Sequence, residues 1–341
     1  MDSANPRVDA NATRRPGACG IHSVHRFAFT VPDLEEARRF YETFGLKVTQ
    51  DGKVLRLGTD AHPHAWGEVH LGGTVKELQY ASFGIDAADE AAMRERIARS
   101  GRACEPHPLS DGTGLWVRNP DGTPWQVVVA PKVSPSVKLP PTPRRAVAPG
   151  QGAAPLRSQV KQVRPRQLSH VLFFTPDVPR MLAFCSEVMG MRLSDRSGDG
   201  IAFIHGVHGS DHHLVAFAKS VAPGLHHSSW DVGSVDEVGE GAEQMMAAGH
   251  RRGWGVGRHV LGSNYFYYVR DPWGSYAEYS FDIDFVPADL DWPAADHPPE
   301  DALYVWGPAL PEDFITNYEP AATAAVAAMA SASPAATAAA A

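Results

Sequence analysis

Hydrophobic and polar positions alternate in short runs along the chain, and the same arrangement of runs occurs twice. Residues 24–48, VHRFAFTVPDLEEARRFYETFGLKV, pass from an alternating run through Pro-Asp and an amphipathic stretch to a glycine before the next apolar run. Residues 168–193, LSHVLFFTPDVPRMLAFCSEVMGMRL, follow the same order. Alternation predicts a strand, Pro-Asp a helix start, and the amphipathic stretch a helix. Each place is therefore predicted to hold a strand–helix–strand unit.

The similarity continues downstream of both units. Residues 77–101 match residues 225–250 as a strand followed by a helix. LWVRNPDGTPWQVVV at 115–129 matches FYYVRDPWGSYAEYS at 266–280 as a closing hairpin with a Pro- and Gly-containing turn. An internal repeat of this length indicates a duplication. We predict an α+β protein of two tandem modules, each a pair of such units.

The repeat also sets the expected boundaries. We expect a disordered N-terminus at 1–20, modules at 21–130 and 167–286, a linker at 131–166, a C-terminal extension at 287–318 and an Ala-rich tail at 319–341. The linker has many prolines, eight Lys or Arg residues and no acidic residue. This composition predicts an extended, solvated spacer, with a phosphate or membrane contact as the alternative interpretation.

Composition limits the classes of function. The 341 residues are 43% hydrophobic and 21% charged, which suits two globular domains. A net charge of −8 without a basic face in the globular parts argues against nucleic-acid binding. Three scattered cysteines, Cys19, Cys104 and Cys185, fit a reducing cytoplasm better than a disulfide scaffold. Because no apolar run has the length of a signal peptide or a membrane span, we expect a cytoplasmic protein without membrane contact.

Matched positions of the two modules separate what folding needs from what chemistry needs. The second module has His170, His227 and Glu278 where the first has Arg26, Tyr80 and Gln126. Two neutral imidazoles and one carboxylate form the facial ligand set of non-haem Fe(II) oxygenases. Alternatively, the three are separately hydrogen-bonded core residues. An unpaired buried carboxylate is costly, which favours a metal as the partner of Glu278.

Three further polar residues accompany this set. His213 precedes an apolar strand, His259 precedes the aromatic run, and Tyr268 lies ten residues before Glu278. Imidazoles exchange protons near neutral pH, and a phenol donates a hydrogen bond to an anionic oxygen. The alternatives are that the tyrosine is ordinary core and that one histidine of each His-His pair lies at the surface.

At these residues the second module resembles the catalytic module of type I extradiol ring-cleavage dioxygenases, of the vicinal oxygen chelate (glyoxalase-like) superfamily. The motif runs Gly257-x-His259, seven residues, Tyr267-Tyr268-x-x-Asp271-Pro272-x-Gly274, three residues and Glu278. Tyr267 departs from the usual aliphatic residue or Phe. The resemblance includes catechol 2,3-dioxygenases and biphenyl-2,3-diol dioxygenases, and it implies βαβββ units curled into open barrels.

The resemblance also implies roles. His170, His227 and Glu278 would bind Fe(II), with Mn(II) as the less expected ion; His213 would be the acid-base, and His259 and Tyr268 would contact substrate. His213 and His227 are preferred to their neighbours His212 and His226, because each directly precedes its apolar strand. The implied reaction is extradiol cleavage of a catechol by O2 to a 2-hydroxymuconic-semialdehyde-type product in aromatic hydrocarbon catabolism. A non-catalytic first module, with its histidines as ordinary polar residues, and a homo-oligomer are further expectations.

Three alternatives stay open. A glyoxalase-like isomerase would take ligands from two modules, a ligand-binding or resistance protein would need no redox metal, and an intradiol enzyme would use tyrosinate ligands to Fe(III). Aromatic residues at Phe266, Trp254, Trp273 and the segment around Trp306 suggest a roomy enclosure for a substituted or bicyclic catechol, or they are plain packing.

Overall fold

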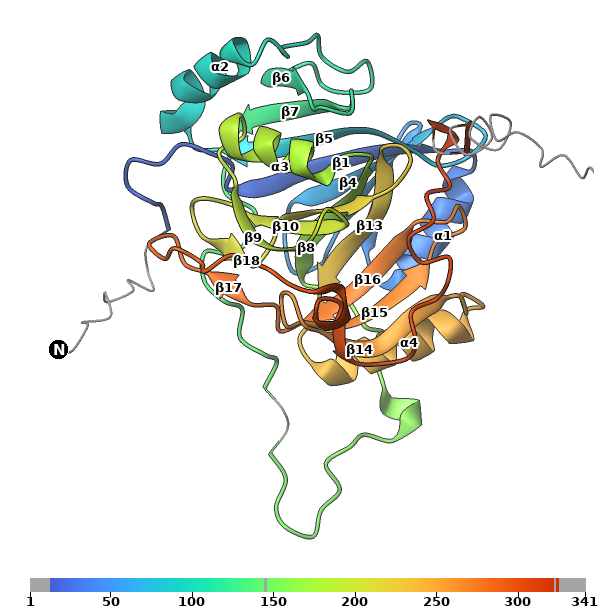
Figure 1. Ribbon diagram of the computed structural model, residues 1–341. Coiled ribbons are helices and arrows are strands. Elements are labelled where there is room, and N and C mark those ends of the chain that lie inside the picture. Colours follow the sequence, from blue (N-terminus) through green and yellow to red (C-terminus); the bar gives the residue numbers. More distant parts are fainter. Residues whose placement is uncertain (1–12, 144–145, 322, 325–341) are drawn as a thin grey trace, which may run out of the picture.

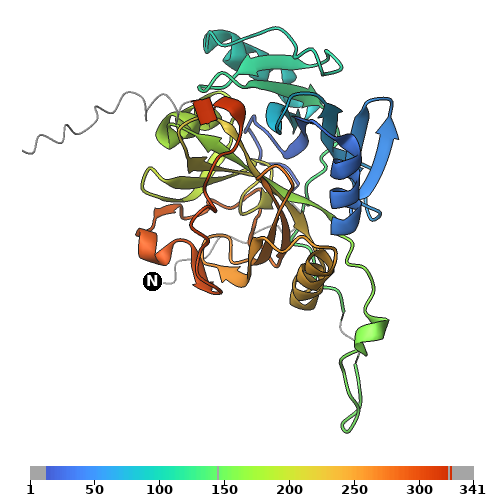
Figure 2. The same ribbon diagram turned by 90° about the vertical axis from the view of Figure 1, so that its right-hand side faces the viewer.

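The computed structural model describes residues 13–143, 146–321 and 323–324 and contains two modules that share one core (Figures 1 and 2). The predictions for residues 1–12 and for most of the Ala-rich tail fall outside the described residues. The α+β architecture of tandem modules is as predicted. Within the described ranges, no helix has the length and apolarity needed to cross a bilayer.

The first module is a seven-stranded sheet in the order β2-β3-β4-β1-β5-β7-β6. Its elements are β1 (Ser23–Val31), α1 (Leu34–Phe44), β2 (Lys47–Asp51), β3 (Val54–Gly58), β4 (Ala65–Leu71), β5 (Glu77–Ile85), η1 (Ala87–Asp89), α2 (Glu90–Arg99), β6 (Leu115–Arg118) and β7 (Pro124–Val129). Helix α1 begins where the sequence predicts, because the Asp33 side chain accepts the backbone N–H groups of Glu35 and Glu36. It ends at Gly45, whose φ of 100° suits glycine.

The second module repeats this plan in a ten-stranded sheet, β18-β9-β10-β12-β8-β13-β16-β15-β14-β19. Its elements are β8 (Gln167–Thr175), α3 (Val178–Glu187), β9 (Arg192–Ser197), β10 (Ile201–His205), β11 (Ser210–Asp211), β12 (Val215–Lys219), β13 (Gly224–Asp231), α4 (Val235–Ala247), β14 (Gly253–His259), β15 (Tyr265–Arg270) and β16 (Tyr276–Phe281). In the part of the chain that the structure describes, two strands of the second module, β11 and β14, have no counterpart strand in the first. Where the second has β14, the first has only the single bridge between Ala103 and Val117.

The C-terminal extension closes one end of the second module. It contains β18 (Ala295–Asp296), η3 (Pro299–Asp301) and β19 (Tyr304–Trp306), and β17 (Phe285–Val286) lies just before it. Strand β17 pairs with β11, β18 with β9 and β19 with β14. In Figure 1 this red-orange segment crosses in front of the strands that carry the aromatic run. The extension is therefore part of the second module's architecture.

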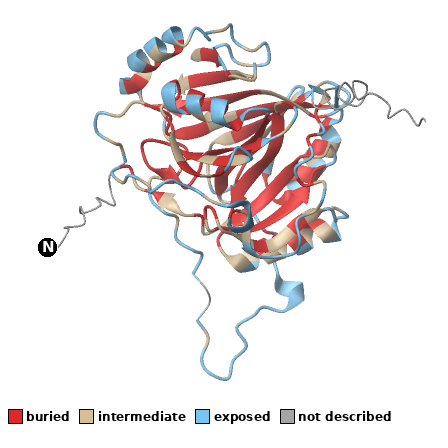
Figure 3. Ribbon diagram, viewed as in Figure 1, coloured by how far each residue is buried: buried red, intermediate tan, exposed pale blue. Residues whose placement is uncertain are grey.

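The two modules are joined by buried contacts. Phe44 of α1 stacks on Tyr279 of β16 with ring centroids 3.9 Å apart, and the Tyr279 hydroxyl donates to the Phe44 carbonyl. Lys76 and Asp271 form an ion pair of 2.5 Å with both side chains almost fully buried. Figure 3 shows the resulting continuous buried interior across both sheets.

The segment 131–166 is exposed in its middle and packed at its ends. Val133 and Val163 are buried, the Thr142 N–H donates to the Gly233 carbonyl, and the Arg166 side chain donates to Asp231. Between these anchors the chain projects from the body, with the short turn η2 (Arg157–Gln159) on the projecting part (Figures 1 and 2). The segment begins against the first module, where Ser134 donates to the His22 carbonyl, and it is bonded to the second module at Thr142 and Arg166.

Candidate metal centre

Three neighbouring strands, β8, β13 and β16, carry His170, His227 and Glu278 on one face. In the strand register Ser229 of β13 lies opposite both His170 and Glu278. Paired residues of a sheet share a face, and so do residues two apart in a strand, which places His227 on this face as well. The repeat's alternation in sequence therefore fixes the direction of all three side chains.

The ligand atoms of the three side chains converge. His170 Nε2 lies 3.2 Å from His227 Nε2 and 3.2 Å from Glu278 Oε2, and His227 Nε2 lies 3.5 Å from the same oxygen. An ion about 2.1 Å from each ligand atom would space such atoms by about 3.0–3.4 Å. The observed spacing fits a single metal ion.

The environment of Glu278 supports the same fit. Its side chain is fully buried; Oε1 accepts a hydrogen bond from Asn264 Nδ2, while Oε2 has no hydrogen-bond partner among the residues that the structure describes. Burial raises the pKa of this carboxyl, but the neighbouring His170 and then His259 outweigh burial and hold the pKa below its usual value. Glu278 is thus an anion whose orphaned oxygen faces two imidazoles, as a metal ligand would be.

Hydrogen bonds behind the ligand histidines fix their tautomers. The Phe314 carbonyl can only accept, so His226 Nε2 donates to it across 2.9 Å. A neutral His226 then has a bare Nδ1, which accepts from His227 Nδ1 across 2.7 Å and leaves His227 Nε2 with its lone pair toward Glu278. Burial, followed by the neighbouring His226 and His170, holds the pKa of His227 far below its usual value, so its imidazole is neutral. Neutral imidazole is the form that binds a metal.

A similar connection exists behind His170. Ser169 donates its hydroxyl to Asp211 across 3.5 Å and can accept from His170 Nδ1 across 3.1 Å. Both partners are buried. His170 Nε2 is thereby free for the ion.

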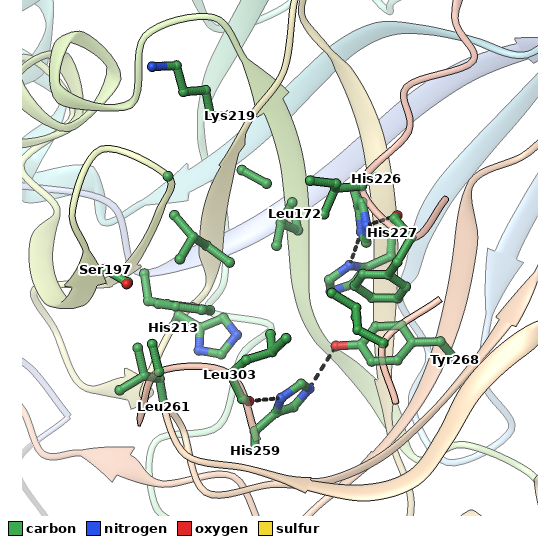
Figure 4. Close-up of a pocket in the computed structure, with 18 of the residues that line it drawn as sticks. Leu172, Ser197, His213, Lys219, His226, His227, His259, Leu261, Tyr268 and Leu303 are labelled. Carbon is green, nitrogen blue, oxygen red and sulfur yellow. Dashed lines mark hydrogen bonds between the residues drawn. The ribbon is translucent and has the colours of Figure 1, made fainter. Parts of the chain in front are cut away.

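His259 and Tyr268 form a pair at the edge of the triad. His259 Nδ1 donates to the Leu303 carbonyl across 2.8 Å, and the Tyr268 hydroxyl donates to His259 Nε2 across 2.9 Å (Figure 4). Burial and the charge of Glu278 raise the pKa of Tyr268 well above its ordinary value. The phenol therefore stays protonated and can act as a hydrogen-bond donor.

His213 lies across the cavity from His227 and Tyr268 (Figure 4). Its ring centroid is 4.0 Å from that of His170, and Phe203 packs edge-on against it. Burial, then the histidines around it, lower the pKa of His213 well below its usual value. His212 does not reach the cavity; its ring bonds Asp195 and Trp292 packs against it. The choice of His213 over His212 at the cavity agrees with this geometry.

These polar groups lie at one end of an otherwise apolar cavity of about 350 Å³. Its wall is formed by Leu172, Ile201, Phe203, Leu261, Leu303 and Leu310. Of the described residues that line it, only Lys219 carries a permanent charge, and its side chain points away from the polar end (Figure 4). The cavity suits a largely apolar ligand with one polar end.

The predicted aromatic enclosure is only partly correct. Leu303, Leu310 and Phe314 of the C-terminal extension do line the cavity. Trp254 and Phe266 are instead fully buried behind Tyr268, and Trp306 is 46% exposed at the surface. Aromatic residues of a sheet pack on each other first, and aliphatic side chains form the wall.

Sequence reasoning missed the groups behind the ligands. Asn264, Ser169, Asp211 and Asp195 were not singled out, nor were the carbonyl acceptors of the extension. Asn264 lies between His259 and Glu278, and an amide beside a predicted buried carboxylate was the available signal. The backbone carbonyl acceptors cannot be recognised from the sequence, because every residue has a carbonyl group.

The corresponding face of the first module holds no such ligand set. Glu68 of β4 faces Arg26 at 3.2 Å, bonds Arg56, and accepts the Tyr80 hydroxyl at 2.9 Å. Burial raises the pKa of Glu68, but His70, Arg26 and the other partners outweigh it and bring the pKa to about 2. This carboxylate is fully matched by protein groups.

Among the residues that the structure describes, one other cluster has the spacing of a metal site. Asp86, Asp89 and His208 lie together where the modules meet, but Arg14 bonds both carboxylates and supplies the positive charge. We therefore assign it a structural role.

Comparisons with known proteins agree with the fold. A family model described as Glyoxalase/Bleomycin resistance protein/Dioxygenase superfamily matches residues 167–279. The chain is 50% identical over 318 residues to metapyrocatechase 2 of Cupriavidus necator, covering 93% of this chain and 98% of that protein. It is 27% identical to a biphenyl-2,3-diol 1,2-dioxygenase of Metapseudomonas furukawaii, over 84% and 93% of the two chains. A solved Mn(II)-bound glyoxalase from Novosphingobium aromaticivorans shares the fold, with a TM-score of 0.67, 23% identity and coverage of 86% and 93%.

Proposed function

Since the chain belongs to the metapyrocatechase family of extradiol dioxygenases, within the glyoxalase and dioxygenase superfamily, we propose that it opens a catechol ring beside the two hydroxyl groups. O2 is the co-substrate, and the product is of the 2-hydroxymuconic-semialdehyde type. The observation that carries the proposal is the orphaned Glu278 Oε2, buried at the polar end of an apolar cavity with two bare imidazole nitrogens within 3.5 Å.

The proposed cofactor is Fe(II), held by His170, His227 and Glu278. Two imidazoles and one carboxylate would hold the ion and leave part of its coordination sphere to the substrates. Such an ion supplies a Lewis acid for the diol and a path for electrons between diol and oxygen. Mn(II) accepts the same donors and is the alternative ion.

The chain's own groups handle the protons of the diol. Tyr268 keeps its proton and donates a hydrogen bond to His259 Nε2 in this structure. With a catechol in the cavity, we expect this hydroxyl to turn to the diol oxygen that has lost its proton, because a charged acceptor makes the stronger hydrogen bond. His259, held by the Leu303 carbonyl, then orients the same edge of the substrate.

His213 is the proposed acid-base. It lies across the cavity from Tyr268, so the two side chains would reach opposite sides of a bound substrate (Figure 4). As a neutral imidazole, its Nε2 could take up a proton from the substrates and return it to an oxygen atom that is retained in the ring-opened product. The apolar wall excludes bulk water from this exchange.

The cavity supports a substituted or bicyclic catechol as substrate. Its volume of about 350 Å³ exceeds what a single ring fills, and Leu172, Ile201 and Leu310 line the part away from the triad. With Lys219 as the one permanent charge in the described lining, a neutral apolar substituent fits better than a carboxylate. The substituent itself is the least constrained part of the proposal.

A glyoxalase-like isomerase is the second candidate, since a manganese glyoxalase shares the fold. It is disfavoured because one module supplies all three proposed ligands and because the cavity contains His213, His259 and Tyr268, which isomerisation of a thiol adduct does not need. A ligand-binding or resistance protein would need neither the ion nor these residues.

The test is to load the protein with Fe(II) without oxygen, add 2,3-dihydroxybiphenyl or 3-methylcatechol, admit air, and record visible absorbance with oxygen uptake. One oxygen consumed per catechol with a yellow product supports the proposal. Gln126→Ala, at the matched position of the first module, is the control and should retain this activity. Metal binding without colour or oxygen uptake across a catechol panel would contradict it and favour the isomerase.

Two further expectations remain predictions. Cys19, Cys104 and Cys185 are free thiols, which supports a reducing compartment such as the cytoplasm. A homo-oligomer is expected as well, and size-exclusion chromatography with light scattering would test it.

A further inference from the structure

His212 and His213 are neighbours in sequence, and their rings are joined by a hydrogen bond. His212 Nδ1 and His213 Nδ1 are 3.1 Å apart, and both rings are buried. His213 lines the cavity, whereas His212 turns away from it toward β9. Two facing ring nitrogens at this distance require one donor and one acceptor.

Asp195 determines which of the two Nδ1 atoms donates the hydrogen bond and which accepts it. Its carboxylate, 6% exposed, accepts hydrogen bonds from His212 Nε2 at 2.8 Å, Trp292 Nε1 at 3.2 Å, and the Ala295 N–H and His297 Nε2 at 3.0 Å each. Burial raises its pKa, but the bonds from His212, His297 and Ala295 outweigh burial and lower it. Asp195 is therefore an ionised, acceptor-only group, and His212 Nε2 must donate to it.

The tautomer of His213 follows from this step. With its proton on Nε2, a neutral His212 offers only a lone pair at Nδ1. His213 must then donate from its own Nδ1, which leaves the lone pair on Nε2, the nitrogen that remains for the cavity. The same order of bonds runs from the Phe314 carbonyl through His226 to His227. In each His-His pair the first ring is anchored by an acceptor-only group and the second works in the site.

We propose that Asp195 and His212 are positioning residues that hold His213 in the tautomer presenting an unprotonated Nε2 to the cavity. The inference rests on the proposed function only for the role of His213 Nε2 as the acid-base. The tautomer of His213 follows from the hydrogen bonds of the chain alone. Asp195 also bonds Ala295 and Trp292 of the C-terminal extension, so one carboxylate orients the proposed base and secures the segment that covers the cavity.

The direct test is nitrogen-15 NMR of histidine side chains in the full chain, loaded with diamagnetic Zn(II). His213→Gln assigns the His213 signals. In the wild-type protein we expect a protonated Nδ1 and an unprotonated Nε2 for His213. His212→Phe keeps the buried volume but removes the Nδ1 acceptor, and a mixture of tautomers is expected.

Kinetics of the Fe(II)-loaded enzyme give the second readout. His212→Phe and Asp195→Asn should lower kcat by about 10- to 100-fold, as for other outer-shell partners, with KM and bound iron unchanged. His297→Gln is the matched control: it removes another donor to Asp195 but leaves the His212 bond, so both the tautomer and kcat should be retained. If His212→Phe fails to fold, Asp195→Asn carries the comparison.

A protonated Nε2 on wild-type His213 would overturn the inference, as would an unchanged tautomer and kcat in both variants. Neither result bears on the proposed function, which fails separately if the wild-type enzyme cleaves no catechol. Equal losses in His297→Gln and His212→Phe would also overturn it, because they would reduce Asp195 to a structural anchor.

Discussion

The two modules use the same sheet face in opposite ways. In the first, the carboxylate of Glu68 is matched by Arg26 and Arg56, and the Tyr80 hydroxyl donates to it. In the second, Glu278 faces two neutral imidazoles and keeps one oxygen without a partner in the described structure. A buried carboxylate needs positive charge in both cases. In the first module arginine side chains neutralise the buried carboxylate. In the second module an exchangeable metal cation would neutralise it.

The strand register shows how the space for a ligand arises. Arg56 and Glu68 pair across β3 and β4 at the place where Phe203 and Ala216 pair across β10 and β12. The long charged side chains of Arg56 and Glu68 in the first module thus correspond to the phenyl ring of Phe203 and the methyl group of Ala216 in the second. The second module has a cavity against its polar face because the corresponding volume is not filled by an ion pair.

The largest expected effect comes from making the second face resemble the first. Glu278→Gln should abolish both iron retention and turnover, because the amide cannot neutralise a cation. The fold should persist, since Gln126 occupies the matched position, and Asn264 still finds an acceptor. Metal analysis, oxygen uptake and circular dichroism check this; full activity would remove Glu278 from the ligand set.

The next effect separates proton transfer from binding. His213→Ala should bind iron and catechol normally but lower kcat by about 100- to 10,000-fold, the usual contribution of a positioned acid-base. Steady-state kinetics with a catechol titration measure the split between kcat and KM. Unchanged kinetics would exclude His213 from this role.

An effect on stability alone is expected from the first module. Glu68→Gln leaves Arg26 and Arg56 without their shared anion, which should cost about 3 kcal/mol of folding free energy, while kcat per folded molecule stays the same. The folded pKa of about 2 lies below the ordinary 4.5, so this stabilisation is complete above about pH 4.5 and is lost as pH falls toward 2.

Urea unfolding between pH 2 and pH 7 measures that dependence in wild type and variant. The wild-type curve should lose the extra stability in acid, and the Glu68→Gln curve should be flatter there. A fall in kcat at constant folded fraction would show that the first face takes part in turnover.

The smallest effect concerns a single hydroxyl. Tyr80→Phe removes one donor from Glu68 and should cost about 1 kcal/mol, the typical net value of a hydrogen bond, without altering oxygen uptake. Thermal unfolding resolves a change of this size. Reduced activity would mean that the two faces are coupled through β5 and β13.

Much of this arrangement was predictable because it depends on strand period. His170, His227 and Glu278 are recognisable in sequence, since alternation fixes which face each occupies and the repeat supplies a reference in Arg26 and Tyr80. The helix beginning after Asp33 was predictable for a similar local reason. These features depend on residues close in sequence or on a regular period.

The remainder depends on segments that meet only in the folded chain. Asp195 reaches His212 from a strand seventeen residues earlier, and the Leu303 and Phe314 carbonyls reach His259 and His226 from the extension. Backbone acceptors carry no side-chain signature. The sequence left the place of Trp254 open for a related reason, because whether a ring lines a cavity or packs behind it depends on packing across several strands.

The C-terminal extension is synthesised after the strands that carry the proposed metal ligands. The ribosome delivers His170, His227 and Glu278 first, and Leu303 and Phe314 follow. Because domains fold in order from the N-terminus during translation, the strands that carry the triad can assemble before the carbonyls that fix two of the surrounding imidazoles have emerged. The tautomers of His259 and His226 are therefore fixed only after the C-terminal extension has been synthesised and has packed against the second module.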